Sequence, residues 1–159
     1  MKTLIVYASK HGCAQNAAEK LAKAFGQDTE VNNVCNITRI DLEDFDRIII
    51  GGSIHAGRIQ GQIKNFARKN LNPLLQKQIG LFICHMEEDN EKAMKELTDN
   101  FPDPLVEHAI AKGLFGGEFD LEKMNFVEKF IIKKVAHVTE SVSNVHDENI
   151  ENFIATMKN

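Results

Sequence analysis

The chain has 159 residues, of which 43% are hydrophobic and 26% charged, so it can bury one hydrophobic core and is too short for two typical domains. Its formal net charge of -4 argues against a nucleic-acid partner, because phosphate backbones are bound by basic surfaces. No apolar run approaches the roughly 18 residues that a membrane-spanning helix needs. Cys13, Cys35 and Cys84 form neither a CxxC pair nor a zinc pattern, which favours thiols in a reducing cytoplasm.

The first half of the chain predicts strands and helices in alternation. Leu4–Tyr7 is a continuous β-prone run that leads straight into a glycine loop, which is typical of a buried strand and not of a signal peptide. The helix around residue 63 is expected to stop near Asn70–Pro73, because proline disfavours helix in the residue before it. The predicted elements are a strand at 4–7, a helix at 14–25, a strand at 30–35, a strand at 47–52 and a helix around 63–67.

The second half continues the same alternation. Its predicted elements are a strand at 79–84, a helix at 90–100, a strand at 109–115, a helix around 124–138 and a helix around 150–157. Pro102 and Pro104 are expected to close the helix before them, and Asp147 is expected to cap the last helix. Cys35 and Cys84, which fall on predicted strands, are expected to be small core residues.

This order of elements predicts an α/β fold, in which five strands form a parallel sheet covered by helices on both faces. The chain has no internal repeat and no linker, so residues 1–159 are expected to form a single domain. Ligands of such sheets bind beyond the carboxyl ends of the strands, where the strand order reverses. The loops 9–14, 53–61 and 85–90 are therefore expected to carry the function.

The loop Ser9–Ala14 runs from the first strand into the first helix and is an expected anion site. The N–H groups at a helix start and the positive end of the helix dipole stabilise negative charge there. Gly12 permits the tight backbone that aims those groups inward, Ser9 adds a hydroxyl donor, and Lys10 can add charge. The alternative is a structural turn in which Ser9 only caps the helix, and the loop by itself leaves both interpretations open.

Several other phosphate-binding motifs are absent. The chain contains neither GxGxxG nor GxxxxGK[ST], which argues against dinucleotide and ATP-type sites. A phosphatase loop needs an arginine six residues after its cysteine, and Glu19 stands at that position after Cys13. A phospho-acceptor receiver domain needs an aspartate at the end of the third strand, where this chain has Gly51-Gly52-Ser53.

The first loop resembles a known phosphate loop. Val6–Ala14, followed by an alanine-rich helix, is similar to the flavodoxin motif [ST]-x-[ST]-G-x-T. Ser9 and Gly12 match the motif. His11 and Ala14 stand where hydroxyl residues are common, so the site would depend more on backbone amides.

Two further segments resemble a subgroup of the flavodoxin family that contains the menaquinone-dependent protoporphyrinogen oxidases. Asp46–Gly57 is similar to the subgroup's G-[AG]-S-I-x-x-G loop, and Phe130–Lys134 is also similar to that group. The resemblance implies a flavodoxin-like three-layer sandwich with strand order 2-1-3-4-5. It also implies noncovalently bound flavin mononucleotide (FMN) and transfer of one or two electrons.

The resemblance further implies that the first loop holds the FMN phosphate and that the next two loops flank the ring. The expected cofactor-binding residues are Ser9, Lys10, His11, Gly12, Cys13, Ala14, Ser53, Ile54, His55, Ala56, Gly57, His85, Met86 and Glu87. His55 is also a weak candidate for a proton donor or substrate contact. The acidic run Glu87–Asp89 is either a solvated loop or a group of charges that disfavours the anionic reduced flavin.

Other readings of the same loops are weaker. His11, His55 and His85 fall at one edge of the predicted sheet, but they share no helix and no metal-ligand spacing, so no metal site is predicted. Cys13 stands at a helix start, where thiolate is favoured, yet it has no partner cysteine nearby in the sequence and is read as a loop residue. Three lysines of the penultimate helix suggest a membrane or partner patch, although an amphipathic helix packed on the sheet is preferred; they are Lys129, Lys133 and Lys134.

Three functions remain open. The favoured one is a cytoplasmic FMN-dependent electron carrier that docks onto redox proteins. The second is a flavin-dependent oxidoreductase of the protoporphyrinogen oxidase type, which acts on a porphyrinogen and a quinone; the short loop Ile83–Asn90 and the net charge of -4 favour the carrier over it. The third is a flavin-free binding module on the same fold.

Overall fold

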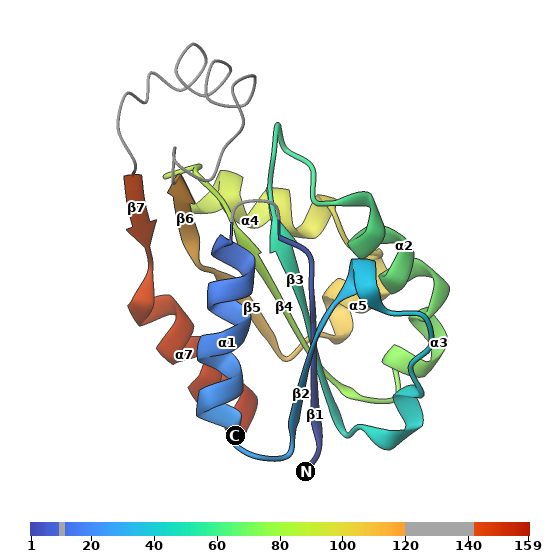
Figure 1. Cartoon of the computed structure of the whole chain (residues 1–159). Coiled ribbons are helices and arrows are strands. Elements are labelled where there is room, and N and C mark those ends of the chain that lie inside the picture. The colour runs from blue at the N-terminus through green and yellow to red at the C-terminus, as the bar shows by residue number, and fades with distance from the viewer. Residues whose placement is uncertain (10–11, 120–141) are drawn as a thin grey trace.

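Runs of aliphatic and β-branched residues form the strands of a parallel sheet, as expected for strands covered on both faces. The computed structural model describes residues 1–9, 12–119 and 142–159. Its main sheet has the order β2-β1-β3-β4-β5, which confirms the predicted α/β fold and strand order (Figure 1). The strands are β1 (Thr3–Tyr7), β2 (Thr29–Asn33), β3 (Arg47–Ser53), β4 (Gln78–Cys84) and β5 (Ala111–Leu114).

The register of the sheet brings the carboxyl ends of its central strands to one edge. Tyr7 of β1 pairs with Gly51 of β3, and Ser53 at the end of β3 pairs with Cys84 at the end of β4. The chain passes from β1 to β2 on one side and then returns to β3 on the other. The strand order therefore reverses beside β1, which is where open α/β sheets bind ligands.

Helices cover both faces of the sheet, and each layer closes its own hydrophobic core. On one face α1 (Cys13–Phe25) and α7 (Asp147–Lys158) lie side by side (Figure 1), packed on alternate strand residues such as Ile5 and Ile49. The opposite face packs Leu4 and Ile48 against the remaining helices and two 3-10 turns. These are η1 (Val34–Asn36), η2 (Leu42–Asp44), α2 (Gly61–Lys69), α3 (Leu71–Leu74), α4 (Asn90–Asp99) and α5 (Asp103–His108).

A glycine in the sheet lets a large aromatic ring pack against the backbone. A Cβ at Gly51 would overlap the ring of Phe82 on the neighbouring strand, and this ring stacks on Phe115 with centroids 5.0 Å apart.

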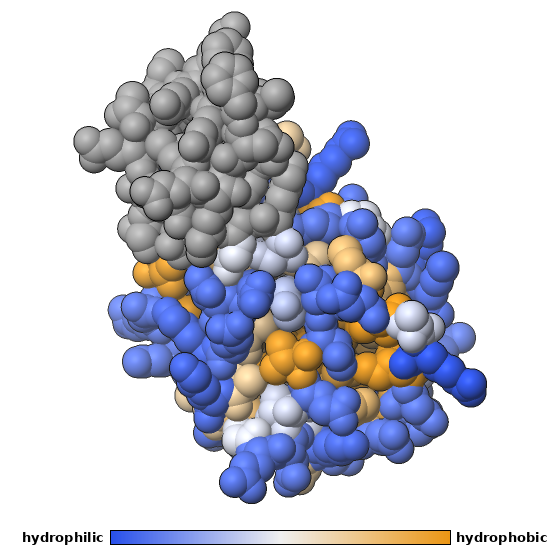
Figure 2. Space-filling view, viewed as in Figure 1, coloured by the Kyte–Doolittle hydropathy of each residue, from blue (hydrophilic) through white to orange (hydrophobic). Residues whose placement is uncertain are grey.

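The molecular surface, seen from the same side as in Figure 1, is mostly hydrophilic, with hydrophobic side chains gathered near its middle (Figure 2). None of the helices in the described ranges is long and apolar enough to cross a bilayer.

The second and fifth strands are shorter than predicted. The chain leaves the sheet after Asn33, whose side-chain oxygen accepts the N–H of Cys35 and starts η1. Cys35 is consequently exposed, and its prediction as a core residue was wrong, whereas Cys84 is buried as predicted. The fifth strand starts only at Ala111, because Ala109 still closes the last turn of α5 through its N–H.

The helices before two prolines end as predicted, α2 at Lys69 and α4 at Asp99, but the short helices that contain these prolines were not predicted. Pro104 lies in the first turn of α5, and Pro73 lies within the short α3. First-turn residues need no intrahelical acceptor for their N–H, so proline is tolerated there. The predicted cap of the last helix was also wrong by one residue: His146 is the N-cap, and Asp147 is the first residue of α7.

The structure adds a second sheet that the sequence analysis did not predict. β6 (Gly116–Phe119) and β7 (Val142–Val145) pair in antiparallel fashion. Their lengths are only four residues each, too short for a clear pattern of alternation. The helix predicted around 124–138 falls outside the described residues, as do Phe130–Lys134 and Lys129.

Candidate functional site

The first loop ends in a left-handed glycine at the start of α1. Gly12 has φ 91° and ψ -10°, a conformation that residues with a side chain adopt only at a cost. Its N–H donates to Oγ of Ser9 over 2.9 Å, and its carbonyl accepts from the N–H of Asn16 over 2.8 Å. The Ser9 side chain thus bonds to the N–H of Gly12, and no side chain caps the helix in the described structure.

The start of α1 leaves its first backbone N–H groups without a capping side chain within the described part of the chain. Among the described residues, no acidic side chain stands in its first turn and no side chain caps it, so the helix dipole is not offset there. Cys13 and Ala14 are buried on the core side of α1. Their contribution to a ligand beyond the helix end would therefore come from backbone groups. Lys10 and His11 lie outside the described residues.

The loop after β3 is a tight turn with two left-handed residues. The N–H of His55 donates to the carbonyl of Arg58 over 2.9 Å, and the N–H of Arg58 donates back to the carbonyl of His55 over 3.1 Å. Between them Ala56 has φ 50° and Gly57 has φ 77°, which is the pattern of a type I′ turn. All four residues are exposed, and the alanine stores strain that the surrounding structure must hold.

A buried asparagine holds this turn from below. Asn100, at the end of α4, is only 4% exposed. Its side-chain N–H groups donate to the carbonyls of Gly57 over 2.9 Å and of Glu96 over 2.6 Å. Its side-chain oxygen accepts the N–H of Ile59 over 3.1 Å. Every hydrogen-bonding group of this amide that faces the turn is used, so α4 sets the position of the loop.

The root of the same loop is closed by a second amide. The side-chain oxygen of Gln60 accepts the N–H of Ser53 over 3.1 Å. A Cβ at Gly52 would lie 2.5 Å from this oxygen, so the glycine makes the approach possible. The N–H of Ile54 meanwhile donates to the carbonyl of Cys84 over 2.8 Å, which extends the pairing of β3 with β4 into the site.

The loop after β4 begins with a buried histidine. His85 is 3% exposed. Its Nδ1 lies 2.9 Å from the carbonyl oxygen of Glu87 and, in the neutral ring, donates a hydrogen bond to it. Its Nε2 is buried and has no partner among the described residues. Burial lowers the pKa of His85, and the hydrogen bond to the Glu87 carbonyl and the charge of Glu87 oppose this shift. His146 lowers the pKa of His85 further; the centroids of the two rings are 5.8 Å apart, with the rings edge to face.

Two glycines of β6 admit the His85 loop. The N–H of His85 donates to the carbonyl of Gly116 over 2.7 Å. A Cβ at Gly117 would lie 2.7 Å from the carbonyl oxygen of His85 and would overlap the sulfur of Met86. The start of β6 therefore forms a wall of the site, and Met86 remains 38% exposed beside it.

The acidic residues after His85 take part in local hydrogen bonds. Asp89 caps α4, since its Oδ1 accepts the N–H groups of Glu91 and Lys92. A side-chain oxygen of Glu87 accepts the N–H of Asp89 over 3.1 Å. Burial raises the pKa of Glu96, and the charge of Glu87 raises it further. The acidic run thus has a structural role in starting α4.

The predicted site residues that the structure describes lie at one edge of the sheet. Ser9, Gly12, Cys13 and Ala14 follow β1, Ser53 ends β3 and residues 54–57 follow it, and His85–Glu87 follow β4. His55 is exposed and His85 is buried. Within the described part of the chain, no three or more His, Cys, Asp or Glu side chains gather closely enough to hold a metal ion.

Sequence reasoning missed four residues that shape this edge. Asn100 and Gln60 support the loop after β3, and Gly116 and Gly117 make room for the loop after β4. The glycine pair was a visible signal, because two glycines directly after a strand indicate a close backbone approach. Asn100 gave no such signal, because its partner Gly57 lies 43 residues away in the sequence.

A family model described as "Flavodoxin domain" matches residues 4–146 of the chain. The match includes β2 to β5, all but the first residue of β1, and the three loops described above.

One group of curated relatives matches a shorter segment. The protoporphyrinogen IX dehydrogenase [quinone] of Escherichia coli (strain K12) is 34% identical to this chain over 77 residues, which is 46% of this chain and 42% of the relative. The matched segment thus spans less than half the length of the curated relative.

Solved structures show the same fold at low identity. A flavodoxin from Streptococcus pneumonia TIGR4 has a TM-score of 0.56 at 18% identity and covers 99% of this chain and 96% of its own. Oxidised flavodoxin 1 from Bacillus cereus has a TM-score of 0.55 at 17% identity, covering 99% and 95%.

Proposed function

The chain belongs to the flavodoxin domain family, and on this premise we propose that it binds FMN noncovalently and carries electrons between redox proteins. The observation that supports this most is the left-handed Gly12 at the start of α1, at the point where the strand order reverses. A helix start in that position favours a phosphate. We also propose that residues 1–159 act as one domain. The odd number and wide spacing of the cysteines favour the cytoplasm as its location.

The arrangement of the loops fits such a ligand. The proposed phosphate contacts are Ser9, Lys10, His11, Gly12, Cys13 and Ala14, and the proposed ring contacts are Ser53, Ile54, His55, Ala56, Gly57, His85, Met86 and Glu87. The buried Nε2 of His85 lacks a partner among the described residues, so a hydrogen-bonding ligand at this edge would satisfy it. FMN would supply one- or two-electron chemistry.

The residues of the chain would orient and protect that group. The Asn100 amide and the Gln60 amide hold the turn at 55–58 in place, so its backbone groups are already positioned for a planar ligand. The Glu87 carbonyl keeps the proton on Nδ1 of His85, which leaves Nε2 as an acceptor. His55, exposed on the turn, is the candidate for a proton donor.

FMN titration of the purified protein, followed by flavin fluorescence and by the visible spectrum, tests the proposal. We expect micromolar or tighter binding, and we expect Gly12→Ala to weaken it about tenfold or more, equal to ~1.4 kcal/mol. Gly26→Ala is the matched control, because Gly26 ends the same helix with φ 88° and a Cβ there meets nothing within 4 Å. Equal losses in the two variants, or no flavin bands in the wild type, would contradict the proposal; the latter would favour a flavin-free binding module.

A second candidate function rests on the partial match to protoporphyrinogen IX dehydrogenase [quinone]. In that case the chain is an FMN-dependent oxidoreductase with a porphyrinogen substrate and a quinone acceptor. The FMN-loaded protein would be mixed with protoporphyrinogen and a menaquinone analogue, and porphyrin fluorescence would be followed. Turnover that depends on both compounds would assign the enzyme; oxidation no faster than in free FMN would assign the carrier.

A further inference from the structure

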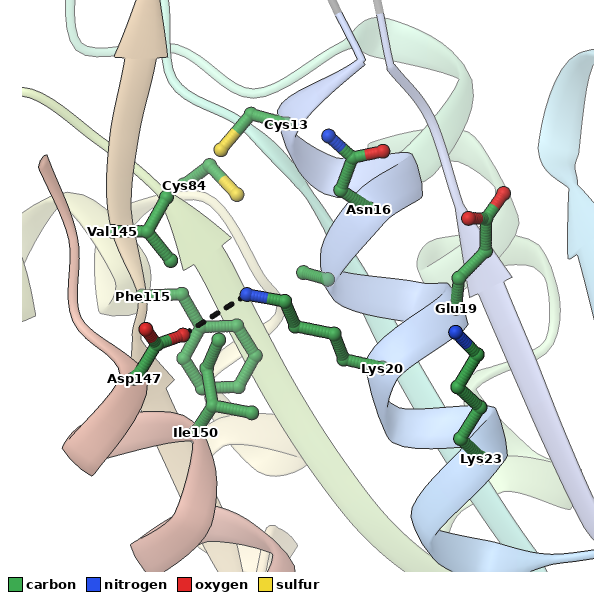
Figure 3. Close-up of a pocket in the computed structure, with 11 residues that line it drawn as sticks. Cys13, Asn16, Glu19, Lys20, Lys23, Cys84, Phe115, Val145, Asp147 and Ile150 are labelled. Atoms are coloured by element: carbon green, nitrogen blue, oxygen red, sulfur yellow. Dashed lines mark hydrogen bonds and ion pairs between the residues drawn. The ribbon is translucent and has the colours of Figure 1, made fainter. Parts of the chain in front are cut away.

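A pocket of about 450 Å³ lies between α1 and α7, below the loop edge of the sheet. Its hydrophobic wall includes Phe115 and Ile150, and its polar side carries Asn16 and Lys20. Lys20 of α1 reaches Asp147 of α7 across it, with Nζ and Oδ1 2.9 Å apart (Figure 3). Of the residues proposed to contact FMN, only Cys13 lines this pocket. The pocket is therefore distinct from the proposed FMN site.

Two cysteines meet in this pocket although they are far apart in the sequence. Cys13 is the first residue of α1, and Cys84 is the last residue of β4. Both line the pocket and belong to the same buried cluster, and their side chains point toward one another (Figure 3). Cys13 is 9% exposed and Cys84 is 3% exposed, and both are present as thiols.

We propose that Cys13 and Cys84 form a thiol–disulfide site, which reacts reversibly with low-molecular-weight disulfides such as glutathione disulfide. The position of Cys13 favours it as the attacking group, because the start of a helix stabilises a thiolate. The pocket gives a small disulfide a route to a thiol that is otherwise covered by the core. Lys23 on the polar side complements a carboxylate of glutathione, whereas Lys20 is already paired with Asp147.

The reaction takes place in two balanced exchange steps. The Cys13 thiolate attacks one sulfur of glutathione disulfide, which forms a mixed disulfide and releases one glutathione thiolate. The Cys84 thiolate then attacks the Cys13 sulfur, which forms the intramolecular disulfide and releases the second glutathione. In total the protein loses two electrons and two protons, and glutathione disulfide gains them.

Closing this bond would tie the start of α1 to the end of β4. Cys13 directly follows Gly12, and Cys84 directly precedes His85, so the disulfide would join two of the loops at the functional edge. A cross-link between distant parts of the chain also restricts the unfolded state. The oxidised protein is therefore expected to unfold at a higher temperature than the reduced one.

The experiment uses the full chain with Cys35→Ser, because Cys35 is exposed and would otherwise form bonds between molecules. The protein is equilibrated in buffers of increasing glutathione disulfide to glutathione ratio, quenched with acid, alkylated and weighed by mass spectrometry. We expect both thiols to disappear together, with the loss of two hydrogen atoms and no added glutathione. The same variant with Cys84→Ser, and separately with Cys13→Ser, is expected to carry at most one glutathione.

Titration with a trivalent arsenical gives a second measurement that needs no further substitution. Such reagents bind tightly only to two thiols that can reach one arsenic atom, so one equivalent should bind to the Cys35→Ser chain and none should bind tightly after Cys84→Ser. Independent titration of the two thiols, accumulation of glutathione adducts alone in the Cys35→Ser chain, or no tight arsenical binding would overturn the proposal.

Discussion

The guanidinium of Arg47, at the start of β3, closes the end of α7. Its Nη2 donates to the carbonyl of Met157 over 2.9 Å, and its Nη1 donates to Oγ1 of Thr3 over 3.3 Å. The ring of Phe25 lies 4.6 Å from the guanidinium carbon. Arg47 is only 8% exposed, and burial lowers its pKa, which the nearby Asp46 partly opposes. One buried cation thus ties α1, β1, β3 and α7 together at the edge opposite the candidate site.

Arg47→Met should destabilise the protein without changing the loops. The substitution leaves the Met157 carbonyl and the Thr3 hydroxyl without their charged donor, and a hydrogen bond to a charged group contributes about 1.5–3 kcal/mol. We expect the free energy of unfolding, measured with urea, to fall by about 2 kcal/mol. Arg68→Met is the control, because Arg68 is exposed and bonds only to Asn65 within α2 in the described structure; a similar loss there would refute this role of Arg47.

Asn100→Ala should loosen the turn at 55–58. The variant loses the hydrogen bonds to Gly57, Glu96 and Ile59, each with a net contribution of about 1 kcal/mol, so we expect a loss of about 2–3 kcal/mol in urea unfolding. FMN affinity should fall as well, because the loop is no longer held in place. Asn72→Ala, at an exposed position of α3, serves as the control. Unchanged FMN affinity in Asn100→Ala would mean that the hydrogen bonds of Asn100 do not contribute to ligand binding.

Ala56→Gly and Gly57→Ala should have opposite effects on stability. Both positions have positive φ, which costs a residue with a Cβ about 1–2 kcal/mol relative to glycine. Gly57→Ala meets no atom within 4 Å, so its expected loss of about 1 kcal/mol reflects the backbone alone. Ala56→Gly should gain a few tenths of a kcal/mol to about 1 kcal/mol, since added freedom in the unfolded chain offsets part of the relief. Thermal unfolding checks both signs.

His85 should make the protein less stable in mild acid. Its pKa in the folded state is lowered by burial and by His146, so the unfolded state takes up a proton first as the pH falls. Its contribution to stability is therefore fully present above the unfolded value of about 6.5 and is lost as the pH falls toward the folded value.

Urea unfolding of the wild type and of His85→Gln between pH 8 and pH 5 measures this effect. The stability of the wild type should fall with decreasing pH, and the variant should show a shallower dependence. The values at pH 8, where the imidazole is neutral in both states, separate the loss of packing from the titration. Parallel curves for the two proteins would mean that His85 does not titrate differently on folding.

The sheet and its helices could be read from local patterns, and the errors have local causes as well. Leu4–Tyr7 and Ile79–Cys84 are apolar without interruption, which is how a strand buried on both faces must look. The helix at 90–99 ends before Pro102 and Pro104 as predicted, but α5 was missed because proline also suits a first turn, and sequence alone does not say that a new helix starts there. β6 was missed because four residues do not establish a period.

The residues of the candidate site also differ in whether a local pattern could indicate them. Gly12 and Ser9 were singled out because a glycine between a strand and a helix has a local physical reason, and both lie between β1 and α1 in the structure. The support of the site was not identified. Asn100, Gln60 and Gly117 contact the loops from elsewhere in the chain, and an amide or a glycine at a distant position carries no mark of its partner.

The sequence by itself thus determined the type of fold and indicated the loop at which we propose an anion site, because periodicity, glycine and helix ends act over a few residues. Only the tertiary structure decided which groups meet there: Asn100 with Gly57, His85 with Gly116, and Cys13 with Cys84. These contacts join segments far apart in the chain, and they depend on the two hydrophobic layers that pack the helices on the sheet. The physical difference is between interactions that a residue makes with its neighbours in sequence and those that packing imposes on it.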